Sequence, residues 1–140
     1  MGVLCKENEL KKKIIVCDVD GVLLNWEDAF QVWMEHQGFK KVKEHQFIYN
    51  AAEQFGLSKT EGKKWVRLFN QSAAIGFLPP LRDAQEVLSL LHNNYGYRFV
   101  VCTSLSKDKA AQELRTRNLK KIFGDIFDDF VYLDTGADKD

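Results

Sequence analysis

The sequence has no long hydrophobic run, few cysteines and no net charge. Its longest uncharged runs fall well short of the roughly 20 residues that a membrane helix needs, and its first 13 residues lack the apolar core of a signal peptide. We therefore expect a cytoplasmic protein with no membrane partner. Twenty basic residues balance twenty acidic ones, so the net charge favours neither an anionic membrane nor duplex nucleic acid as a partner.

The cysteines are odd in number and fit no zinc spacing: Cys5, Cys17 and Cys102. Two of them lie in apolar runs, where a thiol packs like a small hydrophobic side chain, so we expect packing rather than redox or metal chemistry. The 140 residues contain 45% hydrophobic and 29% charged side chains, which is typical of one folded globular domain with at most a small elaboration.

Short apolar runs alternate with helical patterns along the chain. Residues 14–17, 98–102 and 130–133 predict three strands, of which we expect the first to be buried on both faces. Amphipathic spacing predicts helices over residues 84–91 and around residues 110–114. Strands that alternate with helices indicate an α/β fold in which a parallel sheet is flanked by helices and joined by right-handed crossovers.

Residues 25–75 predict a small helical cap inserted after the first strand. Asn25 and Ser58 each stand three residues before an acidic residue, which is the spacing of a helix N-cap. The remaining residues, 1–24 and 76–140, would form the α/β core.

Two groups of side chains in this insert leave alternatives open. The aromatic residues spaced along its helices favour packing, with stacking of a nucleobase as the alternative. The lysines around positions 40–43 and 59–64 favour a solvated face, with attraction of phosphorylated substrates as the alternative.

Polar residues follow each apolar run, and ligands of parallel sheets bind at the carboxyl ends of strands. These residues are Asp18 and Asp20, then Thr103 and Ser104, then Asp134 with Lys139 a few residues on. Two carboxylates two residues apart repel each other unless a cation lies between them or one of them binds a proton. Among oxygen ligands the expected cation is magnesium. The alternative for the aspartate pair alone is a turn or a helix cap.

The stretch Asp18-Val19-Asp20-Gly21, at the end of an apolar strand, resembles the first motif of the haloacid dehalogenase superfamily of phosphotransferases. The strand that ends in Thr103 and Ser104 is similar to its second motif, and the insert is similar to its small helical caps. Within the superfamily, the size of the insert and residues 133–139 resemble the 5'(3')-deoxyribonucleotidases, or type C nucleotidases. The resemblance implies a Rossmann-like core sheet.

The resemblance also implies a magnesium-dependent phosphohydrolase. Asp18 would attack phosphorus to form an aspartyl-phosphate, and Asp20 would act as general acid and base. Thr103 and Ser104 would bind the phosphoryl oxygens, Lys139 would neutralise their charge, and Mg²⁺ would lie at Asp18 and Asp20. The expected substrate is a deoxynucleoside monophosphate. The alternatives are another small phosphate ester, a polynucleotide end, or a catalytically silent module that binds phosphate. The oligomeric state is not indicated.

The last motif of the superfamily, aspartates after a fourth strand that complete the metal site, is harder to find. Asp125 and Asp129 fit its pattern, but they follow Thr103 by only about twenty residues, too few for the further strand and helix expected before that motif. We interpret them as a helix exit and turn. Asp134 would be a candidate if another lysine replaced Lys139. With Lys139 in its role, we expect the chain to stop short of the final aspartates.

Overall fold

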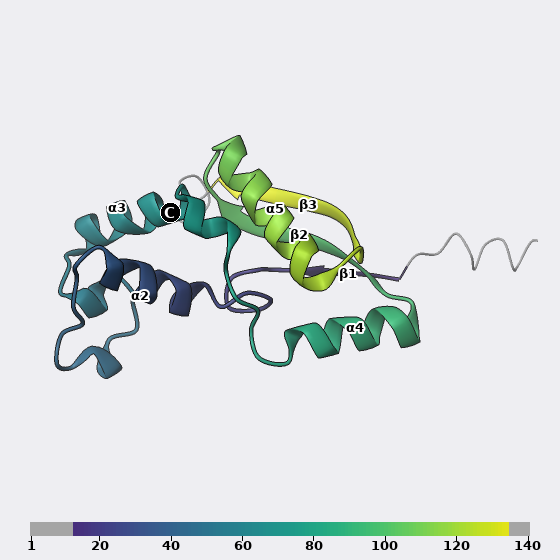
Figure 1. Cartoon of the computed structure of the whole chain (residues 1–140), viewed down its shortest axis with the longest axis horizontal. Helices are drawn as coiled ribbons and strands as arrows, with labels where there is room; N and C mark the ends of the chain where they lie inside the picture. Colours follow the sequence, from purple (N-terminus) through teal and green to yellow (C-terminus); the bar gives the residue numbers. More distant parts are fainter. Residues whose placement is uncertain (1–12, 135–140) are drawn as a thin grey trace, which may run out of the picture.

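The computed structural model describes residues 13–134 and contains one parallel sheet (Figure 1). Its strands stand in chain order, β1-β2-β3. They are β1 (Ile14–Cys17), β2 (Arg98–Leu105) and β3 (Phe127–Asp134). Val16 pairs with Val100, and Val101 pairs with Phe130, all in parallel. The predicted α/β class with a parallel sheet is confirmed.

Two strands are longer than the apolar runs that predicted them. β2 continues to Leu105, so Thr103 and Ser104 belong to the strand rather than to the loop after it. The reason is backbone pairing, because Thr103 lies beside Tyr132 and Ser104 beside Leu133. A polar side chain does not end a strand whose backbone still has a partner on the neighbouring strand.

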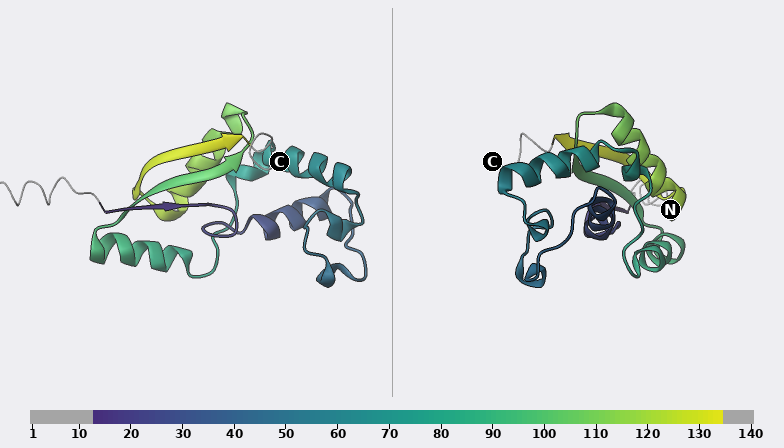
Figure 2. Two further views of the ribbon diagram at one scale, coloured as in Figure 1. Left: turned by 180° about the vertical axis from the view of Figure 1, so that it is seen from behind. Right: turned by 60° about the vertical axis from the view of Figure 1, so that its left-hand side comes forward.

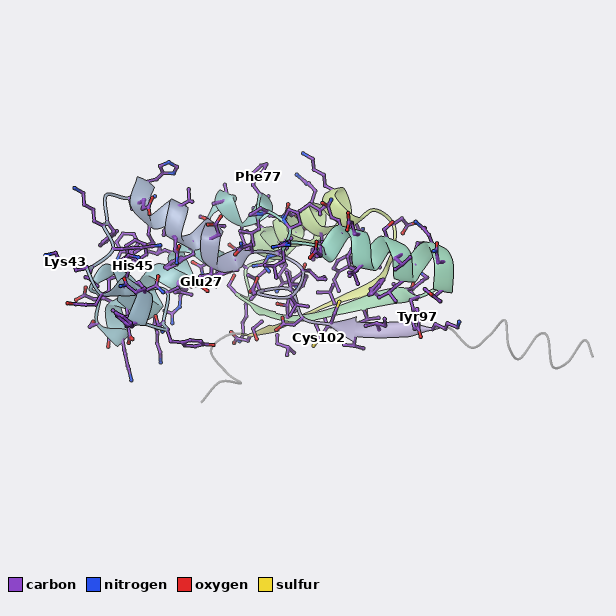
Figure 3. All side chains as sticks on the ribbon, turned by 90° about the horizontal axis from the view of Figure 1, so that it is seen from below. Glu27, Lys43, His45, Phe77, Tyr97 and Cys102 are labelled. Atoms are coloured by element: carbon purple, nitrogen blue, oxygen red, sulfur yellow. The ribbon has the colours of Figure 1, made fainter. Side chains whose placement is uncertain are left out.

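Both helices of the α/β part lie on one side of the sheet (Figure 3). Helix α4 (Ala84–Tyr95) precedes β2, and helix α5 (Lys109–Phe123) joins β2 to β3. The two helices also contact each other. Because the strands follow one another in chain order, successive right-handed crossovers place their helices on the same face.

The opposite face of the sheet is open, which corrects the expectation for the first strand. Ile14 and Val16 are 43% and 66% exposed, so β1 is not buried on both faces. Val131 and Leu133 on β3 are also exposed, and Cys102 is labelled near this face in Figure 3. The covered face carries the buried residues of β2, among them Phe99, Val101 and Leu105.

The helical insert, which follows the loop after β1 and ends before α4, lies beyond the carboxyl ends of the strands (Figures 1 and 2). It contains α2 (Trp26–His36), the 3₁₀ helices η1 (His45–Phe47) and η2 (Glu53–Phe55), α3 (Lys59–Asn70) and the 3₁₀ helix η3 (Ala73–Gly76). The predicted N-caps are present. Asn25 accepts a hydrogen bond from the backbone N–H of Asp28, and Ser58 accepts one from that of Glu61.

Aromatic rings form the interior of the insert. Phe30 is fully buried; Trp26 stacks on it at 4.9 Å, and Phe69 meets it edge to face at 5.5 Å. The indole N–H of Trp26 donates to Asn70 Oδ1 at 2.8 Å, which ties α2 to α3. These rings therefore hold the two helices together.

The two chain segments that connect the insert to the sheet run side by side. Asn25 N–H donates to the Pro79 carbonyl at 2.8 Å, and Leu81 N–H donates to the Leu23 carbonyl at 2.9 Å. These bonds fix where the insert leaves the α/β part. Within residues 13–134, no helix combines the length and the apolar character of a membrane span.

We predict that Phe30→Ala lowers the free energy of unfolding by about 3–5 kcal/mol, because it removes a fully buried ring from the aromatic cluster. The matched control is Phe77→Ala, since Phe77 is 75% exposed and points away from the body of the molecule (Figure 3). The control should change stability by no more than about 0.5 kcal/mol. Urea unfolding measures both, and equal losses would show that the insert does not depend on this cluster.

Candidate active site

A tight loop follows β1 and carries both candidate carboxylates. The carbonyl of Val19 accepts the backbone N–H groups of Val22–Leu24, and Gly21 has a φ of 74°, a left-handed conformation that glycine adopts without strain. Val19 and Leu24 are fully buried and anchor the loop. Of the two aspartates that flank Val19, Asp18 is exposed and Asp20 is half-buried.

A cleft of about 740 Å³ lies between the end of the sheet and the helical insert. Four of the predicted site residues line it: Asp18, Asp20, Thr103 and Ser104. The structure therefore brings the polar ends of β1 and β2 to one place. From the insert, α3 contributes one face of its helix to the same cleft.

Asp18 is the most accessible of these groups. The residue is exposed, and its Oδ1 accepts a hydrogen bond from the backbone N–H of Val19 at 2.7 Å. This bond orients the carboxylate without burying it. An oriented, accessible carboxylate can act as a nucleophile or as a ligand of a cation.

Asp20 is held by an arginine that the sequence did not reveal as part of the site. Arg115 Nη1 lies 2.7 Å from Asp20 Oδ1, and Arg115 is fully buried. In the described part of the chain, its Nε and Nη2 atoms have no hydrogen-bond partner. A signal for it did exist: Ala111, Arg115 and Leu119 follow one another at four-residue intervals on the buried face of α5, where a third apolar residue is expected.

The ion pair places the positive charge of Arg115 beside the Asp20 carboxylate. Tyr132, the other titratable group that interacts with Arg115, does not supply a second negative charge. Burial raises the pKa of the Tyr132 phenol, and the smaller effects of Thr116 and Arg115 oppose this shift. The phenol is therefore neutral at neutral pH. Arg115 thus occupies one oxygen of Asp20, and the use of that oxygen in proton transfer requires the contact to loosen.

Thr103 lines the cleft and carries a buried, unsatisfied hydroxyl. Thr103 is 2% exposed, and within the described residues its hydroxyl has no hydrogen-bond partner. A buried polar group without a partner costs about 1–3 kcal/mol, so an acceptor oxygen placed there would be favoured. Ser104 is half-buried and lies next to it in the cleft lining.

Cys17, next to Asp18, is not a competing nucleophile. Burial, and to a smaller extent the charge of Asp18, raises the pKa of its thiol. The thiol is then protonated at neutral pH and only weakly nucleophilic. This is consistent with the packing role expected from the sequence.

Asp125 and Asp129 do not join the cleft. Asp125 pairs with Arg98, the first residue of β2, and so does Asp128. This places them at the amino ends of the strands, opposite Asp18. The Oδ1 atom of Asp129 accepts a hydrogen bond from the next backbone N–H in β3. The interpretation as a helix exit and turn holds for Asp125, which lies in the bend after α5. It is wrong for Asp129, because β3 begins at Phe127, three residues earlier than predicted, and Asp129 pairs with Val100 of β2.

The last two candidates lie at or beyond the end of β3. Asp134 is the final residue of the strand, and its Oδ2 is 3.3 Å from Lys107 Nζ. Among the residues that the structure describes, it is not part of the cleft lining. Lys139, the predicted phosphate-binding lysine, lies outside the described residues.

The side chains of the cleft could hold a magnesium ion only with few protein ligands. Between residues 13 and 134 there is no cluster of three His, Cys, Asp or Glu side chains that could hold a metal. One oxygen of Asp20 already contacts Arg115, which leaves Asp18 as the accessible carboxylate. Magnesium often binds through one or two carboxylates and takes water and substrate phosphate as its other ligands. The Asp18 carboxylate suits such a site.

No protein-family model matches the chain. A curated relative, an uncharacterized 32.4 kDa protein from the Gp30-rIII intergenic region of enterobacteria phage T4, is 27% identical over 136 residues. The match covers 92% of this chain and 48% of the relative, so the chain spans about half the length of that protein. A solved Thermotoga maritima structure, assigned by name to the beta-phosphoglucomutases, is 20% identical with a TM-score of 0.43. It covers 86% of this chain and 61% of that one, a similarity too low to assign a fold or a function.

We predict that the Asp20–Arg115 pair responds asymmetrically to substitution. Asp20→Asn leaves a fully buried guanidinium without its counter-ion and should cost about 3 kcal/mol of unfolding free energy. Arg115→Met should cost less, because the side chain of Asp20 is 33% exposed and remains hydrated. In the double variant, Arg115→Met should restore most of the stability lost in Asp20→Asn.

Urea unfolding of the four proteins in this cycle measures the effect. Asp83→Asn is the matched control, since Asp83 pairs with Arg82 on the exposed surface and its loss should matter by no more than about 0.5 kcal/mol. Strictly additive losses in the double variant would contradict the buried pair.

Proposed function

We propose that the chain is a magnesium-dependent phosphohydrolase of the haloacid dehalogenase type, with Asp18 as the nucleophile and a nucleoside monophosphate as the expected small substrate. The observation that carries this proposal is that one cleft is lined both by Asp18, whose carboxylate is accessible, and by Thr103, whose buried hydroxyl has no hydrogen-bond partner among the described residues. An attacking anion and a hydrogen-bond donor for the oxygens of its target are the two groups that transfer of a phosphoryl group needs.

The reaction would run in two displacements. An Asp18 oxygen attacks phosphorus, the ester P–O bond breaks, and the leaving alcohol oxygen takes a proton. Water then attacks the aspartyl-phosphate, loses a proton, and releases inorganic phosphate and free Asp18. Asp20 in its ionised form suits the second step as the base that takes the proton of water. In the first step it can protonate the leaving oxygen only once the ion pair with Arg115 loosens.

Thr103 and Ser104 would donate hydrogen bonds to the phosphoryl oxygens, and Lys139 would contribute positive charge. The Asp18 carboxylate and the Asp20 backbone carbonyl would hold Mg²⁺, which when bound supplies charge neutralisation for the phosphate. In this proposal residues 25–75 are the cap, and residues 1–24 and 76–140 are the core.

A phosphate-binding module without turnover is the second candidate. The Asp20–Arg115 ion pair favours it, because the Asp20 oxygen that Arg115 occupies can take part in proton transfer only if the contact loosens. Such a module would show a higher melting temperature with phosphate or magnesium and would hydrolyse nothing.

We predict that Asp18→Asn reduces magnesium-dependent phosphate release from nucleoside monophosphates by about 10³-fold or more, since the amide cannot serve as the nucleophile. Release of inorganic phosphate is measured with and without a magnesium chelator. Asp129→Asn is the matched control and should keep full activity, because Asp129 lies on β3 outside the cleft.

Unchanged turnover in Asp18→Asn would refute the assignment of the nucleophile. No turnover of any phosphate ester by the native chain, together with a melting temperature raised by phosphate, would favour the silent module instead.

A further inference from the structure

Three cations stand in a row on the face of α3 that lines the cleft: Lys59, Lys63 and Arg67. Four residues advance a helix by about 6 Å, so the row is roughly 12 Å long. The same cleft contains Asp18 and Thr103. A single phosphate at Asp18 and Thr103 would not need a row of this length. The row provides positive charge for more than one phosphate group.

The row has no counter-ion in the described structure. Of the ion pairs between residues 13 and 134, none includes these three side chains. Glu53 also lines the cleft, as the one acidic side chain that the described part of the insert contributes to it. Like charges four residues apart destabilise a helix by about 0.2–0.5 kcal/mol per pair, so the row carries a cost that bound anions would offset.

Exposed aromatic rings lie beside the cleft. Phe47 and Tyr49 are 81% and 100% exposed, although the insert buries Phe30 completely. They line a second hollow that shares Trp26 and Asn50 with the cleft, so the two hollows adjoin. Rings left in water next to a row of cations are the combination with which proteins bind single-stranded nucleic acid, by stacking bases and pairing phosphates.

We propose that the cleft binds the phosphorylated end of a single-stranded nucleic acid. The terminal phosphate lies at Asp18 and Thr103, the following phosphates lie along Lys59, Lys63 and Arg67, and bases stack on Phe47 and Tyr49. The position of the terminal phosphate rests on the proposed function. The chain needs no net positive charge for this, because the cations are concentrated on one helix face.

The test measures binding of fluorescent single-stranded oligonucleotides by anisotropy, with a phosphate at the 5' end in one arm and at the 3' end in another. The Asp18→Asn chain is used so that nothing is turned over. Three neutralised phosphates, at about −0.7 each, give a slope near −2 for the logarithm of affinity against that of salt concentration. Affinity should then fall roughly 20-fold between about 50 and about 200 mM salt.

Three further variants, all made in the Asp18→Asn chain, locate the binding site. Replacing Lys59, Lys63 and Arg67 by Gln should weaken binding at least 10-fold and abolish most of the salt dependence. The control replaces Lys40, Lys64 and Lys121 by Gln, which removes the same charge from exposed positions outside the cleft lining and should leave the affinity within about twofold. Phe47→Ala with Tyr49→Ala should weaken binding of the oligonucleotide but not of a mononucleotide, because each stacked base contributes about 1–3 kcal/mol.

Three results would overturn the proposal: equal loss in the row variant and the control, preference for duplex over single strand, or equally strong competition by a small sugar bisphosphate. The failures are separable. Phosphate release from mononucleotides without oligonucleotide binding overturns this inference and leaves the proposed function intact. Binding that depends on the row, without release of the terminal phosphate by the native chain, supports the inference and contradicts the proposed function.

Discussion

The parallel pairing of β1 with β2 is the constraint on which the site depends. Because Ile14–Cys17 lies alongside Arg98–Val101 in parallel, the residues that follow each segment meet at one edge of the sheet. A one-residue slip in this register would turn the alternating side chains of β1 to the other face. The connection between the two strands has to return to the starting end of the sheet, and the helical insert occupies its first part. The insert therefore stands over the carboxyl edge, and the cleft forms between them.

The ion pair of Asp20 with Arg115 joins this edge to α5. The two residues are 95 positions apart in the sequence, and the arginine is fully buried. One buried cation thus orients one carboxylate of the pair and leaves Asp18 accessible. The two aspartates, which the sequence presents alike, therefore differ in environment: Asp20 contacts a buried cation, whereas Asp18 is exposed.

Local features of the sequence were predictable, and features that depend on distant partners were not. The N-caps at Asn25 and Ser58 and the position of Asp18 after β1 follow from near neighbours. The burial of β1 depends on which face the crossover helices cover, and an apolar run is the same whether one face or two are covered. The end of β2 depends on its pairing with β3. Arg115 could be recognised only from its place among buried residues of α5. The sequence left the lysines at positions 59–64 open between a solvated face and attraction of phosphorylated substrates, and their place beside the cleft depends on where α3 packs.

The proposed function depends on Asp18 being the nucleophile. The most direct measurement is to mix the native chain with a labelled phosphate ester and magnesium, quench it with acid within one turnover, and map the label by peptide mass spectrometry. The account predicts a covalent phosphate on the peptide that contains Asp18, absent from Asp18→Asn. Release of phosphate with no covalent intermediate, or with the label on another residue, would contradict it.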